Sequence, residues 1–278
     1  PMTSKLEEMD RVVHEPDQEF VESTNVWQFM QEYGIEDYEE LIRRTTSEVP
    51  DEPDSGIDWF WDELVDYLDL QFYEGYDQVR DRSEGPAFDD WYPGGELNIA
   101  HNVVDRYAEP DAESRNKVAC IWEAENGTVR EVTFHELHRQ SNQVANALEA
   151  RGIETGDTVG LYMPMVPEVI SILYGCFKAG AIAVPIFSGF GADATATRIT
   201  ASECSVMFTG DGFLRRGNEI MIKPKADEAI EQAGYVEDVI VFDRLGSPES
   251  VPMDEQRDEW WDDAVATRSD EYETKSLP

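Results

Sequence analysis

The chain has 278 residues, with 60 acids against 22 bases and a net charge of −38. Its 41% hydrophobic and 11% aromatic content argues against a disordered acidic chain, which lacks the apolar residues that form a core. The acids are spread along the sequence rather than gathered in blocks, which leaves an acidic nucleic-acid mimic as a minor alternative. We interpret the charge as a salt-adapted surface, because net charge governs solubility rather than fold.

The cysteines and apolar runs indicate a cytoplasmic protein, and we expect a high-salt cytosol. Cys120, Cys176 and Cys204 form neither a disulfide framework nor a metal spacing, so we expect free thiols in a reducing compartment. No basic-then-apolar leader opens the chain. The longest apolar stretch, Val169–Phe187, is interrupted by Lys178 and favours a buried helix followed by a strand over a membrane span. We expect neither a membrane nor a nucleic acid as partner.

The first part of the chain is acidic and has helical periodicity. Apolar residues recur at helical spacing in three segments: Val26 to Tyr33, Tyr38 to Ile42, and Trp59 to Tyr67. Gly34 follows the first as a C-cap, and the breaker run Val49–Gly56 precedes the third. Residues 1–90 are therefore predicted to form an acidic helical N-terminal extension.

The pattern changes in the next segment. Pro93, Gly94 and Gly95 predict a turn, and residues 97–107 are apolar on a helical period. Residues 118–122 and 129–132 read as strands joined by an Asn-Gly turn at 126–127.

Strands and helices then alternate. Thr133 and Glu136 form a capping box for a helix ending near Ala150. The predicted strands are Thr158–Tyr162, Ala181–Pro185, Val206–Gly210 and, as the last, Val239–Phe242; the predicted helices are Pro167–Ala179, Ala192–Ala201 and one within Leu214–Ala233. This alternation predicts an α/β fold with a mostly parallel sheet flanked by helices. We assign residues 91–245 to this sheet subdomain and 246–278 to an acidic tail, in which Trp260-Trp261 anchors one short helix.

Motifs for phosphate binding and nucleophilic catalysis are absent. The sequence contains no G-x-x-x-x-G-K-[ST], no strand-linked G-x-G-x-x-G and no G-x-S-x-G. Thr209–Gly212 follows a strand, but its Asp would repel phosphate, so we read a plain turn. His135 and His138 share a helix face, yet two nitrogens without a third ligand make a weak metal site, and His101 reads as a structural histidine. We predict no metal site and no catalytic residue.

One segment is basic. Arg215, Arg216, Lys223 and Lys225 fall within eleven residues that hold one acid, Glu219. Positive charge against so acidic a background indicates an anionic partner, and an arginine fork suits phosphate. The equally weighted alternative is a helix face whose charges pair with neighbouring acids.

Several stretches together resemble a known family. They are FVESTNVWQFMQEYGIEDYEEL (20–41), WYPGGELNIAHNVVDR (91–106), GDTVGLYMPMVPEVISILYGCFKAGAIAVPIFSGF (156–190) and WWDDAV (260–265). Together they resemble the acetyl-CoA synthetase-like acyl-CoA synthetases of the AMP-forming adenylating superfamily. The block at 156–190 is the most specific to the superfamily, and the block at 91–106 points to the acetyl/propionyl branch.

The resemblance implies an incomplete adenylating-enzyme N-terminal domain. In the family a carboxylate attacks ATP, with Mg²⁺, to give an acyl-adenylate, and coenzyme A then takes the acyl group. The family's phosphate loop ending Pro-Lys-Gly, its adenine and ribose motifs and its C-terminal lysine do not occur here, so no catalytic residue is carried over. We expect an inactive N-terminal part of an acetate/propionate-type ligase, whose partner is the remaining C-terminal part in cis or trans. The alternative is a non-catalytic module that binds coenzyme A or a partner protein.

One ligand contact is implied by the resemblance. The family's turn that helps to hold the nucleotide end of coenzyme A matches Phe187, Ser188, Gly189 and Phe190, and its arginine-bearing loop matches Arg215, Arg216, Gly217 and Asn218. Ser188 replaces a glycine and Asn218 replaces the second arginine. Arg216 or Lys223 are the candidates to take over 3′-phosphate recognition. In the family the acyl pocket lies beyond the part matched by this chain, so this sequence does not indicate which carboxylic acid is the substrate.

The charge generates a first prediction. The melting temperature of the chain should rise steeply with KCl concentration, because salt screens the repulsion among surface acids to within a few ångströms. Thermal unfolding followed by circular dichroism over a KCl series measures it. A melting temperature independent of KCl would contradict a salt-adapted surface.

Overall fold

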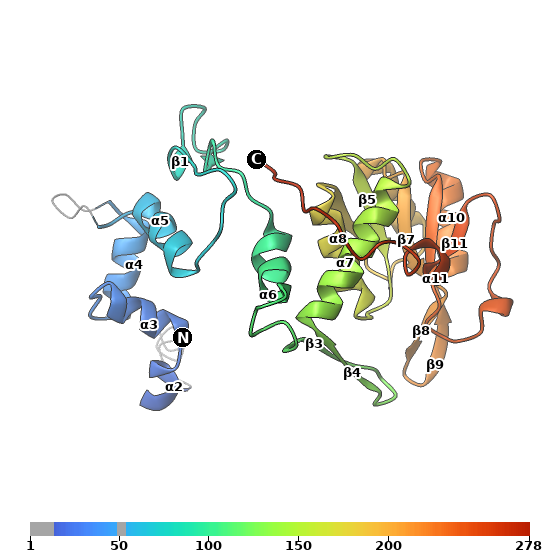
Figure 1. Cartoon of the computed structure of the whole chain (residues 1–278), viewed down its shortest axis with the longest axis horizontal. Coiled ribbons are helices and arrows are strands. Elements are labelled where there is room, and N and C mark those ends of the chain that lie inside the picture. The colour runs from blue at the N-terminus through green and yellow to red at the C-terminus, as the bar shows by residue number, and fades with distance from the viewer. Residues whose placement is uncertain (1–13, 49–53) are drawn as a thin grey trace, which may run out of the picture. The chain divides into compact units, whose positions relative to one another are not determined.

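The computed structural model describes residues 14–48 and 54–278; part of the predicted breaker run Val49–Gly56 therefore lies outside the described residues. The chain divides into two compact units (Figure 1). Unit 1 comprises the chain up to Leu70 together with Tyr76–Gly94, and unit 2 comprises Gln71–Gly75 and Gly95–Pro278. Each unit has its own buried apolar cluster and is described by itself.

Unit 1 is mainly helical. Its elements are α2 (Gln18–Glu22), α3 (Asn25–Glu32), α4 (Tyr38–Thr46), α5 (Ile57–Tyr67) and the paired two-residue strands β1 (Arg80–Asp81) and β2 (Asp90–Trp91). The three predicted helices are present as α3, α4 and α5. Helix α2 was not predicted; it begins after Asp17, whose side chain accepts the N–H of Phe20 as an N-cap. Phe29, Met30 and Leu41 form the buried cluster of the unit together with Ile35.

Unit 2 is an α/β unit. Before its sheet come a π-helical turn (His101–Asp105), α6 (Arg106–Ala108), the hairpin β3 (Val118–Glu123) and β4 (Val129–Thr133), and α7 (Phe134–Glu149). The predicted Thr133–Glu136 capping box is present at the start of α7. The rest comprises β5 (Thr158–Tyr162), α8 (Glu168–Lys178), β6 (Ile182–Pro185), α9 (Ala192–Ser202), β7 (Val206–Gly210), β8 (Gly212–Arg215), β9 (Asn218–Met221), α10 (Lys223–Ala233), β10 (Asp238–Phe242), a 3₁₀ turn (Pro248–Ser250), β11 (Asp258–Trp260) and α11 (Trp261–Ala264).

The sheet of unit 2 is wholly parallel. Its strand order is β11-β10-β7-β5-β6, and every neighbouring pair runs in the same direction. Strand β7 is buried along its whole length at the centre of the sheet. The apolar residues of α7, α8 and α11 pack on one face, and those of α9 and α10 pack on the other. This confirms the predicted mostly parallel α/β fold flanked by helices.

Two parts of unit 2 depart from the sequence prediction. The antiparallel hairpin β8–β9 precedes α10, where only a helix was expected. Residues 246–278, expected as an acidic tail, supply the edge strand β11, so Val239–Phe242 is not the last strand. Both have a physical reason: β8–β9 lies outside the sheet, and β11 is a three-residue edge strand, so neither produces the apolar run that marks a buried strand.

Cys176 and Cys204 are buried and Cys120 is partly buried, and all three are free thiols.

Within the described ranges, no helix has the length and apolar character needed to cross a membrane.

The last residues of the chain lie along α7 without regular structure. Side-chain amides of α7 donate to their backbone carbonyls: Gln143 to Ala266 (2.9 Å), Asn142 to Asp270 (2.8 Å) and Asn146 to Ser269 (2.9 Å). Because these amides satisfy carbonyls that have no strand partner, residues 266–271 are fixed by side chains. Further along, the backbone N–H of Lys275 donates to the carbonyl of Lys178 (3.0 Å), and Leu277 forms an isolated bridge with Leu97.

A buried ion pair fastens the same segment. The Lys178 ammonium, which is fully buried, lies 2.5 Å from Asp105 Oδ1, and Thr274 donates to Asp105 Oδ2 (2.6 Å). Burial by itself raises the pKa of Asp105, but the hydrogen bond from His138 and the charge of Lys178 lower it to about 2. Since this pKa lies below the ordinary value of 3.8, the ionised carboxylate stabilises the fold above about pH 4, and the contribution is lost as the pH falls towards 2.

Replacing Asp105 should therefore be costly at neutral pH. Asp105→Asn should lower the free energy of unfolding by about 3 kcal/mol, because it leaves the buried Lys178 ammonium without its counter-charge. The double variant Asp105→Asn/Lys178→Met should lose less, since no unpaired charge remains. Urea unfolding at pH 7 in KCl measures both.

Lys275→Met is the matched control: it removes a partly exposed pair with Glu149 (3.4 Å) and should cost less than about 1 kcal/mol. Equal losses for Asp105→Asn and Lys275→Met would contradict the assignment.

Candidate functional site

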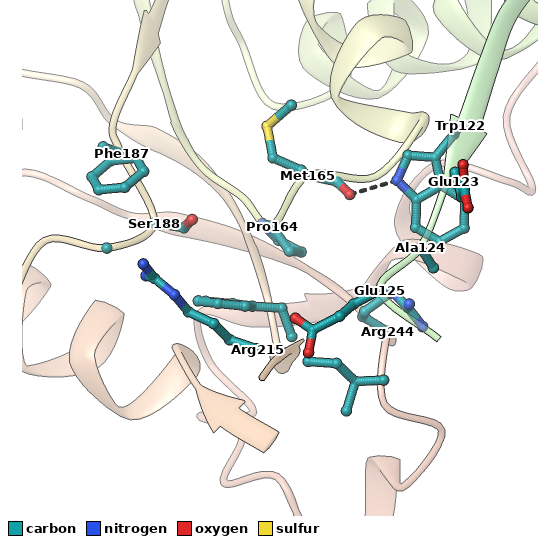
Figure 2. Close-up of a pocket in the computed structure, with 13 residues that line it drawn as sticks. Trp122, Glu123, Ala124, Glu125, Pro164, Met165, Phe187, Ser188, Arg215 and Arg244 are labelled. Carbon is teal, nitrogen blue, oxygen red and sulfur yellow. Dashed lines mark hydrogen bonds between the residues drawn. The ribbon is translucent and has the colours of Figure 1, made fainter. Parts of the chain in front are cut away.

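A cavity of about 500 Å³ opens at the carboxyl ends of the central strands. It is lined by residues 164–165 after β5, 187–189 after β6 and 213–215 in β8, together with residues 122–125 of the β3–β4 hairpin and Arg244 after β10 (Figure 2). The chain passes from β5 to β6 on one side of β5 and then crosses to β7 on the other side. Successive connections diverge there, which is where open α/β sheets bind ligands.

The loop after β6 forms an aromatic wall. Tyr162 donates from its hydroxyl to the carbonyl of Phe190 (2.7 Å), which ties this loop to the end of β5. The rings of Phe187 and Phe190 meet edge to face with centroids 5.4 Å apart. A Cβ on Gly189 would lie 2.3 Å from the Phe187 ring, so a side chain at this position would displace that ring. Phe187 is exposed at the cavity and can offer its ring face to a planar ligand.

A buried carboxylate connects the loops after β7 and β10. Asp211 accepts the backbone N–H of Gly212 (2.6 Å) and of Arg244 (2.9 Å) through Oδ1, and that of Leu245 (3.0 Å) through Oδ2. Burial raises the pKa of Asp211, and these three backbone hydrogen bonds oppose the rise. The predicted plain turn at Thr209–Gly212 thus has a structural role, since the carboxylate fixes the start of β8 and the loop that carries Arg244.

The β8–β9 hairpin presents the predicted arginine to the cavity. Arg215 ends β8 and pairs with Asn218 across the hairpin. Arg216 and Gly217 form the two-residue turn, with φ of 53° and 75°, as a type I′ turn requires. Of the seven predicted site residues, Phe187, Ser188, Gly189 and Arg215 line the cavity, whereas Arg216, Gly217 and Asn218 do not.

Lys223 is not available to a ligand. Its ammonium is fully buried and lies 2.6 Å from both Asp227 and Asp258, which also accept from Arg257. The sequence alternative, a helix whose charges pair with neighbouring acids, therefore describes Lys223 correctly, and the suggestion that it replaces the missing arginine was wrong.

The structure adds cavity residues that the sequence did not single out. Trp122 donates from Nε1 to the carbonyl of Met165 (2.8 Å), and the guanidinium of Arg244 lies 5.2 Å from the centre of the Trp122 ring. Glu125 accepts the backbone N–H of Gly217 (2.6 Å), so the β3–β4 hairpin is bonded to the β8–β9 turn. Arg244 follows a parallel strand and could have been found from that position. Trp122 and Glu125 lie outside the sheet and carry no such signal.

The histidines do not form a metal site. His138 hydrogen-bonds Asp105 (2.8 Å), His135 lies 3.3 Å from Arg115, and His101 lies 2.9 Å from Gln71. Over residues 14–48 and 54–278, no three His, Cys, Asp or Glu side chains gather as a metal ion would need.

An open parallel sheet, with an aromatic-walled and arginine-bearing cavity where its connections diverge, defines an α/β protein with a cavity at the position where such sheets bind ligands. Comparison with known proteins narrows this class. Residues 107–275 match the family model of the AMP-binding enzymes, and residues 48–103 match that of the acetyl-coenzyme A synthetase N-terminus. The chain belongs to the AMP-binding enzyme family.

Individual relatives agree with the family match. The acetyl-coenzyme A synthetase of Methanothrix thermoacetophila is 36% identical over 277 residues, which are 99% of this chain and 40% of that protein. The acetyl-coenzyme A synthetase of Deinococcus radiodurans is also 36% identical, over 99% of this chain and 40% of its own. The acetoacetyl-CoA synthetase of Streptomyces lividans, 24% identical, has the same fold with a TM-score of 0.82 over 95% of this chain and 39% of that chain. The chain thus spans about 40% of the length of these relatives.

Proposed function

We propose that the chain is the N-terminal part of an AMP-forming acyl-CoA ligase of the acetate/propionate type. The observation that supports this is the similarity to acetyl-coenzyme A synthetases over 99% of the chain. The match of residues 107–275 to the AMP-binding enzyme family favours a ligase over a non-catalytic module. The complete protein would activate a carboxylate with ATP and Mg²⁺ and pass the acyl group to coenzyme A.

Within this chain, the proposed role of the cavity is to hold the nucleotide end of coenzyme A. Phe187 offers a ring face to the adenine, and Ser188 and Gly189 line the same wall. Arg215 supplies a planar guanidinium that can bind a phosphate through two parallel hydrogen bonds. It has no ion-pair partner among the residues that the structure describes, so no acid needs to be displaced. Arg216, Gly217 and Asn218 would act through the turn that positions Arg215.

The exposed arginine of the cavity supports an anionic ligand. Arg215 is exposed and lines the same cavity as Phe187 of the aromatic wall. An adenine nucleotide matches both features of the cavity, because its planar base suits an aromatic ring and its phosphate groups suit an arginine.

Phosphoryl chemistry is assigned to the remainder of the protein. The sequence has no glycine-rich phosphate loop, and the structure's described part gathers no carboxylates for Mg²⁺. The electrostatic stabilisation that adenylate formation needs would come from residues beyond these 278.

Arg215→Ala in the complete protein should raise the KM for coenzyme A about ten-fold, the typical cost of losing a charge-assisted hydrogen bond. Acetate-dependent ATP–pyrophosphate exchange should be unchanged, because that half-reaction does not use coenzyme A. Arg216→Asn is the matched control: it removes an adjacent charge and leaves an Asn-Gly pair suited to the type I′ turn. This variant should change the KM for coenzyme A by less than about two-fold, because the turn keeps its geometry and Arg215 keeps its position. An unchanged KM in Arg215→Ala, or a large rise in Arg216→Asn, would reject Arg215 as the phosphate contact.

The chain of residues 1–278 alone should show no acetate-dependent ATP–pyrophosphate exchange, since the proposal assigns that step to residues outside it. The assay uses saturating ATP, Mg²⁺ and acetate in high KCl, with the complete protein as positive control. Exchange above background would refute this division of labour.

A further inference from the structure

Lys223 is buried and Arg216 does not line the cavity, so neither replaces the second arginine of the loop. The cavity nevertheless contains a second arginine. Arg244 lines it from the loop after β10, on the side opposite Arg215 in the view of Figure 2. From this geometry we propose that Arg244 is a second phosphate-binding residue of the coenzyme A site, an inference that rests on the proposed function.

The position of Arg244 is fixed by three other groups. Its backbone N–H donates to the buried Asp211 (2.9 Å), and its guanidinium lies over the Trp122 ring at 5.2 Å from the centroid. Trp122 is itself held by its hydrogen bond to the carbonyl of Met165 (2.8 Å). A guanidinium over a ring face makes that contact without using its N–H groups as hydrogen-bond donors, so they remain available to an anion. Arg244 is thus preorganised, which reduces the entropy lost on binding.

Arg244 also retains its charge. It forms no ion pair with any carboxylate in the described part of the chain, although Glu123 and Glu125 line the same cavity. Glu125 is engaged by the N–H of Gly217 (2.6 Å), and its carboxylate appears between the two arginines in Figure 2. Two cations separated by an acid suit a ligand with two separate anionic groups better than a single phosphate cluster.

The nucleotide end of coenzyme A has two such groups, the 3′-phosphate and the 5′-diphosphate, on one ribose. With Arg215 assigned to the 3′-phosphate, Arg244 takes the diphosphate. The assignment differs from a purely structural role for Arg244, in which its stacking on Trp122 would merely brace the hairpin.

The experiment uses the complete protein and two acceptors, coenzyme A and 3′-dephospho-coenzyme A. Arg244→Met keeps the apolar contact with Trp122 and removes the charge. It should raise the KM for both acceptors by a similar factor of about ten, leaving acetate-dependent ATP–pyrophosphate exchange unchanged. Arg244→Lys restores a charge without the fork and should recover part of the loss. Arg215→Ala should instead raise the KM for coenzyme A alone and abolish the preference between the two acceptors.

Two results would overturn the inference. Unchanged KM values for both acceptors in Arg244→Met would reduce Arg244 to a structural role, while an effect of Arg215→Ala in the same assay would leave the proposed function standing. A loss in Arg244→Met confined to coenzyme A would reject the diphosphate assignment. If Arg215→Ala has no effect on either acceptor, the proposed site fails and this inference fails with it, which distinguishes the two failures.

Discussion

The parallel direction of all five strands is the constraint on which the site depends. Because the strands of unit 2 run the same way, the loops that follow β5, β6, β7 and β10 emerge at one edge. The connections reverse direction around β5, which leaves space between the loops after β5 and β6 on one side and the loop after β7 on the other. Phe187, Arg215 and Arg244, which are distant in the sequence, line one cavity there.

The buried Asp211 carboxylate connects two of these loops. It is fixed at the end of β7 and accepts backbone hydrogen bonds from the start of β8 and from the loop after β10. Both arginines of the cavity lie on segments attached to this residue. The Asp211 carboxylate does not line the cavity, and its oxygens accept backbone N–H groups instead.

Basic side chains in this acidic chain differ in whether a carboxylate neutralises them. Buried or half-buried basic groups such as Lys178, Lys223 and Arg257 are paired with acids and stabilise the fold. Arg215 and Arg244 form no such pair among the described residues. The proposed phosphate contacts rest on these two arginines lining one cavity.

The sequence by itself determined the elements whose periodicity is strong. Strands β5 and β7 begin and end where their apolar runs do, and the capping box fixes the start of α7, because each signal is local and reflects burial on one or both faces. Resemblance to a family supplied Phe187, Ser188, Gly189 and Arg215. Only the tertiary structure decided that Arg244 and Trp122 share their cavity, that Lys223 does not, and that the acidic end of the chain adds the edge strand β11. The physical reason is that pairing across an edge, stacking on a ring and burial of a charge depend on partners far away in the sequence, which no local pattern records.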